Sequence, residues 1–282
     1  MTTFTNVALL ALSLLVLGAQ GGLVKRVVGG QQYDDGDYPY SVSLWYMGEN
    51  NIFTNNTPGM HHTCGGSLID PEWVLTSALC FDDNFLPGLG NTSLWFVVVG
   101  MYGQKDADED AQFLTIDQIF MGPKYNLSES YGDIALLKLS SAASIDDDTV
   151  STVGYNFNSD CPEVNQSCTV IGWGQTQEEP FGYGAEFPSE VDVDVVSEAD
   201  CVDFYYNPNV TALMGPIRID NGTLCAGLPQ GGADACYGDS GSPLLCGCDL
   251  EDQVYTVVAG IVSTGLGCAR AGTPAIYTQV SE

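Results

Sequence analysis

Short apolar runs, each bounded by glycine, proline, asparagine or aspartate, recur along the chain from Tyr40 onward. Apolar and polar residues alternate within these runs, which is the two-residue period of a half-buried β-strand. We expect strands over Ser41–Tyr46, Leu94–Val99, Phe113–Ile119, Ile134–Leu139, Thr169–Ile171, Val191–Val196, Val254–Val262 and Ile276–Val280. Helical periodicity is scarce, and no short repeat or low-complexity tract interrupts the pattern. Many short strands with frequent turn signals predict an all-β barrel or sandwich.

The composition is strongly acidic. The 282 residues include 36 Asp and Glu against 7 Lys and Arg, which gives a net charge of −29, and 45% of the residues are hydrophobic. That hydrophobic content is enough to build a core, so a disordered chain is not expected. A polyanion repels nucleic acid and anionic membrane surfaces, so we expect neither as a partner. A highly soluble secreted protein accounts for this charge.

The N-terminus and the cysteines indicate an oxidising, extracellular compartment. Residues 1–20 predict a signal peptide, because an apolar run from Val7 to Leu17 is followed by small residues, although the usual basic start is missing. This run is too short for a membrane anchor, and no second segment is long enough. The ten cysteines are therefore expected in disulfides rather than at a metal. The Asn-x-Ser/Thr sequons of a glycoprotein occur at Asn55, Asn91, Asn126, Asn165, Asn209 and Asn221.

The stretch Asp234–Pro243 carries the chemistry. It reads Asp-Ala-Cys-Tyr-Gly-Asp-Ser-Gly-Ser-Pro, with Gly238 and Gly241 on either side of Asp239 and Ser240. Glycines let the backbone turn where a side chain would clash. Successive backbone N–H groups can then point at one spot and hold an oxyanion. The stretch resembles the active-site serine segment of the trypsin/chymotrypsin family of serine proteases.

The resemblance covers Arg26–Val280, nearly all of the mature chain. His61–Ile69 resembles the core strand of the family's first barrel, and Cys168–Gly174 resembles the strand that opens the second. The resemblance implies two antiparallel Greek-key β-barrels, here over 27–145 and 146–282, with the active site in the cleft between them. The family also has a C-terminal amphipathic helix, and this sequence ends without one.

The resemblance assigns a catalytic triad that lacks its base. Ser240 would be the nucleophile, Asp133 the orienting aspartate, and the backbone N–H groups of Gly238 and Ser240 the oxyanion hole. The family's histidine stands in the pattern Thr-Ala-Ala-His-Cys, and the corresponding run Thr76–Cys80 has Leu79 in that place. Leucine accepts no proton. In a well-studied serine protease, loss of the base costs about a million-fold in turnover, or roughly 8 kcal/mol.

Only two histidines are available to replace the missing base. His61 and His62 precede Cys64, which the resemblance places in a disulfide close to Leu79. A general base must lie within hydrogen-bond reach of Ser240. Family members often carry a histidine near this strand in a structural role, so we do not expect a substitute base.

Residues 21–26 predict an activation propeptide. They end on a Lys-Arg pair and are followed by Val-Val-Gly-Gly, which resembles the family's activation site. Cleavage after Arg26 by an activating protease would free the amine of Val27. In the family, that amine pairs with the buried carboxylate before the serine, here Asp239. The alternative interpretation is that this segment is a simple loop and not an activation site.

The specificity pocket of the resemblance is largely preserved. Asp234, six residues before Ser240, matches the position whose carboxylate binds Lys or Arg side chains. Ser263 and Gly265 match the strand that pairs with the substrate backbone, and the glycine keeps one pocket wall open. Ala275 stands where trypsin-like members have glycine. Its methyl group would narrow the pocket, so we expect weakened binding of basic side chains.

The resemblance implies four disulfides, namely Cys64–Cys80, Cys168–Cys246, Cys201–Cys225 and Cys236–Cys268. Cys161 and Cys248 are left over. Each lies close in sequence to one member of the Cys168–Cys246 pair, so we expect them to pair with each other.

No metal or other cofactor is expected. Residues 106–110 include four acidic side chains in a loop where some family members bind Ca²⁺. Met101 stands where the first carboxylate ligand would be expected. A solvated acidic loop is therefore the better interpretation.

The sequence supports two main functions. Leu79 in an otherwise preserved site favours a secreted, catalytically impaired protease homologue that binds peptide substrates or protease inhibitors. The alternative is an active endopeptidase that cleaves after Lys or Arg and obtains its base in another way. A relic with no specific role is a third possibility. We expect a monomer in each case.

Overall fold

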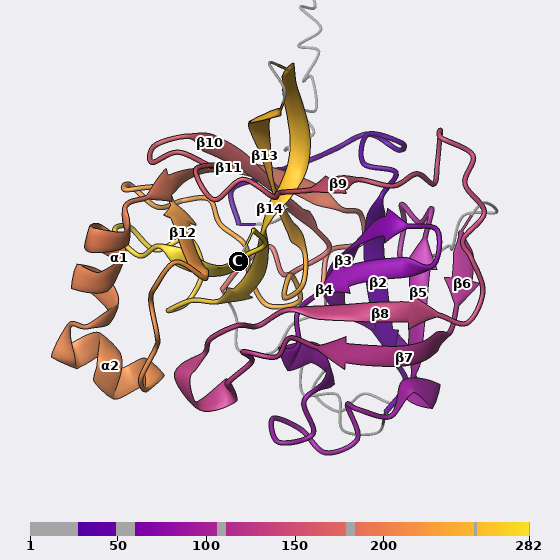
Figure 1. Cartoon of the computed structure of the whole chain (residues 1–282), viewed down its shortest axis with the longest axis horizontal. Helices are drawn as coiled ribbons and strands as arrows, with labels where there is room; N and C mark the ends of the chain where they lie inside the picture. Colours follow the sequence, from indigo (N-terminus) through magenta and orange to yellow (C-terminus); the bar gives the residue numbers. More distant parts are fainter. Residues whose placement is uncertain (1–27, 49–59, 106–110, 179–183, 251–252, 282) are drawn as a thin grey trace, which may run out of the picture.

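The computed structural model describes residues 28–48, 60–105, 111–178, 184–250 and 253–281. Two curled antiparallel β-sheets hold nearly all the regular structure (Figure 1), which confirms the predicted all-β, two-barrel architecture. The predicted signal peptide, the propeptide and the acidic loop lie outside the described residues. No helix in the described ranges is long and apolar enough to cross a membrane.

The first barrel is built from seven strands in the order β6-β5-β2-β3-β4-β8-β7. Its strands are β2 (Ser41–Tyr46), β3 (His61–Asp70), β4 (Trp73–Thr76), β5 (Trp95–Val99), β6 (Gln112–Leu114), β7 (Ile116–Met121) and β8 (Ala135–Leu139). Single 3₁₀ turns, η2 (Leu79–Phe81), η3 (Thr92–Leu94) and η4 (Leu127–Glu129), interrupt its loops. Leu44, Leu68 and Leu137 are fully buried in its core.

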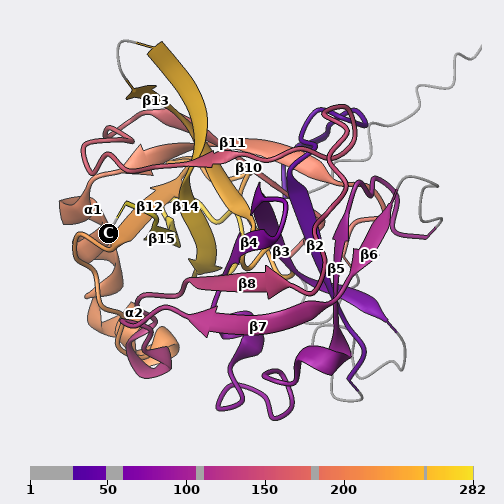
Figure 2. The same cartoon turned by 45° about the vertical axis from the view of Figure 1, so that its right-hand side comes forward.

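The second barrel contains the remaining strands, in the order β1-β11-β10-β13-β14-β15-β12, and a further pairing of β11 with β12 closes it. They are β1 (Gln31–Gln32), β9 (Gly154–Tyr155), β10 (Ser167–Gly172), β11 (Ser189–Val196), β12 (Thr223–Gly227), β13 (Pro243–Leu250), β14 (Gln253–Thr264) and β15 (Ala275–Gln279). The short strand β9 adds to β14 in parallel. Helices α1 (Glu198–Tyr205) and α2 (Pro208–Met214) lie on the side of this barrel away from the first (Figures 1 and 2).

Most of the predicted strands are present with shifts of one or two residues at their ends, and Ser41–Tyr46 has the predicted bounds. The single strand expected over Phe113–Ile119 is wrong. It is two strands, because β6 pairs with β5 and β7 pairs with β8, at opposite edges of the sheet. The chain must leave one partner and join another, which a count of alternating residues does not reveal.

All five expected disulfides are present, including Cys161–Cys248. This last bridge ties the β13–β14 hairpin, which projects beyond the barrel in both views, to the segment before β10 (Figures 1 and 2).

The two barrels pack together through a shared apolar cluster. Leu75 of the first barrel is buried with Ile171, Leu245 and Ile261 of the second. A backbone hydrogen bond of 2.9 Å, from Gly65 N–H to the carbonyl of Ser240, also crosses between them. These contacts fix the geometry of any site assembled from both barrels.

Candidate active site

Ser240 lies in a tight turn that leads into β13. The Asp239 N–H donates to the Cys236 carbonyl over 2.9 Å, and the turn is glycine-dependent at two points. Gly238 has φ +97° and Gly241 has φ +89°, values that favour glycine. A Cβ on Gly241 would also lie 2.4 Å from the carbonyl oxygen of Gly65. The local sequence therefore determines this turn, as predicted.

Two backbone donors of the turn are available for a ligand. Within the described residues, neither the Gly238 N–H nor the Ser240 N–H donates to a protein acceptor. The carbonyl of Gly238 is held from the buried side by His62 Nε2 at 2.9 Å. The Tyr237 carbonyl, which shares a peptide with the Gly238 N–H, accepts from the Gln175 N–H at 2.8 Å. The Asp239 carbonyl, which shares a peptide with the Ser240 N–H, accepts from the Ser242 N–H at 2.8 Å, so both donors have a defined direction. Such free, fixed donors are what an oxyanion hole requires.

His62 is fully used in holding this turn. Its Nδ1 accepts from the Ser43 hydroxyl at 2.7 Å, and that oxygen in turn accepts from Trp45 Nε1 at 2.8 Å. Burial lowers the pKa of His62 to about 4, so the ring is neutral at physiological pH. With both nitrogens engaged, His62 has none left for the Ser240 hydroxyl. His61 is not among the residues that line the pocket beside Ser240.

The carboxylate of Asp133 is buried just before β8 and is held by several donors. Its Oδ1 accepts from the Ser77 hydroxyl at 2.7 Å and from the Leu79 N–H at 2.8 Å. Its Oδ2 accepts from the Ser263 hydroxyl at 2.7 Å. Burial raises the pKa of Asp133, and these hydrogen bonds oppose the rise. The links to Ser77 and Ser263 have no signature in the sequence.

The structure places Leu79 between Asp133 and Ser240. Its backbone N–H binds Asp133, and its side chain lines the same pocket as Ser240. In the described part of the chain, the Ser240 hydroxyl makes no hydrogen bond. The arrangement therefore brings a serine hydroxyl, a buried carboxylate and two free backbone N–H groups together, with the aliphatic side chain of Leu79 beside them.

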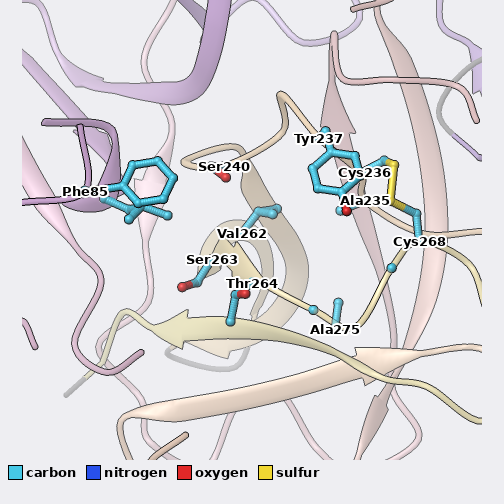
Figure 3. Close-up of a pocket in the computed structure, with 13 residues that line it drawn as sticks. Phe85, Ala235, Cys236, Tyr237, Ser240, Val262, Ser263, Thr264, Cys268 and Ala275 are labelled. Atoms are coloured by element: carbon cyan, nitrogen blue, oxygen red, sulfur yellow. A yellow bond between two sulfur atoms is a disulfide. The ribbon is translucent and has the colours of Figure 1, made fainter. Parts of the chain in front are cut away.

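A pocket of about 240 Å³ opens beside Ser240 (Figure 3). Residues of both barrels line it: Leu79, Phe85, Ala235, Cys236, Tyr237, Ser240, Val262, Ser263, Thr264, Gly265, Gly267, Cys268 and Ala275. The predicted pocket residues Ser263, Gly265 and Ala275 are among them. The hydroxyl of Ser263 faces Asp133. Phe85, which the sequence did not single out, belongs to the loop that follows η2.

Asp234 lies behind this lining rather than in it. Its side chain is 4% exposed, and Oδ2 accepts from the Ala269 N–H at 3.1 Å. Oδ1 has no partner among the described residues. Burial raises the pKa of Asp234 to about 6. A Cβ added to Gly265 would lie 3.7 Å from the Ala275 Cβ, so the two walls face each other closely.

Asp239 is completely buried under the turn. Its Oδ1 accepts from the Gly174 N–H at 2.8 Å and its Oδ2 from the Cys236 N–H at 2.9 Å. Burial is the main cause that raises the pKa of this carboxyl to about 7. Its predicted partner Val27, together with Arg26, lies outside the described residues. The next residue, Val28, forms a β-bridge with Asp234 close to the Ser240 turn.

Comparison with known proteins agrees with this geometry. The family model described as Trypsin matches residues 27–282. Human Trypsin-3 is 32% identical over 258 residues, which cover 90% of this chain and 69% of that protein. Similarity of this extent spans both barrels and every element described above.

Proposed function

Because the chain belongs to the trypsin family, we propose that it is a secreted trypsin-like homologue that binds peptides in its cleft with little or no turnover. One observation carries the proposal. The residue that joins Asp133 to the Ser240 pocket is Leu79, whose side chain has no atom that can accept the serine proton. The base carries about a million-fold of turnover in a comparable protease.

The parts that bind a peptide do not depend on a base. The free N–H groups of Gly238 and Ser240 would receive a carbonyl oxygen, and the adjoining pocket would receive a side chain. The Oδ1 of Asp234, which lacks a partner in the described residues, favours a lysine or arginine there. Such a site can hold a substrate segment or a protease inhibitor without cleaving it.

Processing after Arg26 is part of the proposal. A buried carboxylate is stabilised by a buried cation, and Asp239 accepts only backbone N–H groups within the described residues. The Val27 amine freed by cleavage would supply that cation. The docking of Val28 against Asp234 supports this path. Five disulfides support an extracellular location.

Two measurements on the chain cut after Arg26 test the proposal. A fluorophosphonate probe should label Ser240 no faster than it labels the Ser240→Ala control. A broad-range protein inhibitor of trypsin should bind, and Asp234→Asn should weaken that binding at least tenfold. Rapid labelling of Ser240 together with cleavage after Lys or Arg would overturn the proposal.

The alternative function is an active endopeptidase that cleaves after Lys or Arg. The hydrogen bonds of Asp133 and the free oxyanion donors favour it, because both parts have the arrangement that catalysis requires. The hydrogen bonds of His62 count against it, since this ring is already satisfied. The same labelling experiment decides between the two functions.

A further inference from the structure

The place of the missing base is occupied by an apolar surface. Leu79 is half-buried and lines the pocket together with Phe85, whose side chain is 39% exposed. Figure 3 shows Phe85 on one side of Ser240, with Tyr237 and the Cys236–Cys268 disulfide on the other. The surface is therefore continuous with the pocket and partly open to solvent.

The loop that carries Phe85 is held in place. The Phe85 N–H donates to the Asp82 carbonyl at 3.0 Å. Asp82 is 5% exposed, and its carboxylate accepts from the Asn84 N–H at 2.8 Å and from the Tyr125 hydroxyl at 2.9 Å. Burial raises the pKa of Asp82, but the hydrogen bonds together outweigh it, so the pKa lies below its usual value. A charged, buried anchor of this kind makes the position of Phe85 a fixed feature of the cleft.

We propose that Leu79 and Phe85 form an apolar subsite, and that the cleft selects peptides in which a lysine or arginine is flanked by apolar side chains. The inference rests on the proposed function, since it assumes that Asp234 attracts the basic side chain. A leucine and a phenylalanine offer no polar atom that a water molecule must continue to solvate. An apolar ligand side chain placed there removes surface from water on both partners.

Charge complementarity supports the lysine or arginine of the proposed peptide. The net charge is −29, and the Asp234 Oδ1 has no partner among the described residues. The described pocket lining contains no charged side chain, so the basic residue contributes through Asp234 behind it, and the flanking residues contribute through the apolar wall. A peptide that lacks either the basic residue or the flanking apolar residues makes only part of these contacts.

Equilibrium binding of two peptides tests the subsite, with the full chain used both uncut and cut after Arg26. The peptides are Ac-Ala-Leu-Lys-Leu-NH₂ and Ac-Ala-Ser-Lys-Ser-NH₂, and mass spectrometry confirms that neither is cleaved. We expect the leucine peptide to bind about tenfold more tightly, in keeping with the burial of apolar side chains. Leu79→Ala and Phe85→Ala should each reduce this preference about threefold or more.

Matched controls come from the same chain. Leu213 on α2 is 74% exposed and Phe157 is 71% exposed, and neither lines the pocket. Leu213→Ala and Phe157→Ala should leave the preference unchanged. Binding of both peptides with equal affinity, or a preference that survives both subsite substitutions, would overturn the subsite alone. Failure of both peptides to bind would overturn the proposed function and the subsite with it.

Discussion

Replacing Leu79 by histidine should create measurable proteolysis, and this change probes the site most directly. The backbone of residue 79 is already anchored to Asp133 through its N–H at 2.8 Å. The Asp133 Oδ2 accepts from Ser263, which leaves it a second lone pair for an imidazole Nδ1–H. Leucine and histidine are similar in size, and the side chain at 79 already lines the Ser240 pocket. The new imidazole would thus have Asp133 as a partner on one side and Ser240 on the other.

The size of the gain follows from what is already built. A base contributes about a million-fold in a well-studied serine protease. We expect a smaller gain in turnover here, because Ala275 narrows the pocket and because the new imidazole is imperfectly placed. We expect Leu79→His to raise turnover by about a thousand-fold or more over the native chain, which corresponds to roughly 4 kcal/mol of transition-state stabilisation.

The assay is cleavage of a lysine peptide amide by the chain cut after Arg26. The new activity should rise with pH through the range near pH 6.5, because only the neutral imidazole accepts the serine proton. Leu79→Ala removes the leucine without adding a base and serves as the control. Adding Ser240→Ala to Leu79→His should abolish the gain.

No gain in Leu79→His, despite intact inhibitor binding, would refute the inference that the base is the missing part. A gain that survives Ser240→Ala would refute the assignment of the nucleophile. Native activity equal to that of the histidine variant would show that another group already acts as the base.

Three further changes test the surroundings of the site. From about pH 4 to pH 7 the free energy of unfolding of the uncut chain should fall as pH rises, because burial raises the pKa of Asp239 to about 7 and the folded state keeps its proton over that window. Urea unfolding should show a flatter slope in Asp239→Asn and after cleavage at Arg26, and identical slopes would contradict this. His62→Ala should destabilise the chain by roughly 1–3 kcal/mol and weaken inhibitor binding, because the buried Gly238 carbonyl loses its donor. A loss of residual turnover with unchanged stability would instead identify His62 as a base. The double change Cys161→Ser with Cys248→Ser should lower the free energy of unfolding in urea by about 2–4 kcal/mol and leave inhibitor binding unchanged. A loss of inhibitor binding would show that this bridge shapes the cleft, contrary to the prediction.

The fold was predictable because its signals are local. Alternation places apolar side chains on one face of a strand, and the turn around Ser240 depends on glycines whose positive φ no other residue adopts easily. Helices α1 and α2 were not predicted. Ser197 caps α1 through the Asp200 N–H, but the helix is too short for a clear period.

Part of the site was predictable for the same reason. Ser240, Gly238 and Asp239 are neighbours in the chain, so their arrangement follows from one turn. Asp133 could be named only through the resemblance, because nothing around it in sequence shows what it contacts. Its donors Ser77 and Ser263 lie 56 and 130 residues away.

The sequence by itself determined the all-β class, the serine turn and the absence of a histidine at position 79, while the expectation of two barrels came from the resemblance to the family. Each of these depends on residue identity or on contacts within a few residues. Only the tertiary structure decided that His62 is committed to Gly238, that Asp234 lies behind the pocket lining, and that Phe85 lines the same pocket as Leu79 and Ser240. The first and last of these facts depend on how the two barrels pack, and the second depends on how segments within one barrel pack around the cleft, so no local pattern in the sequence reveals them.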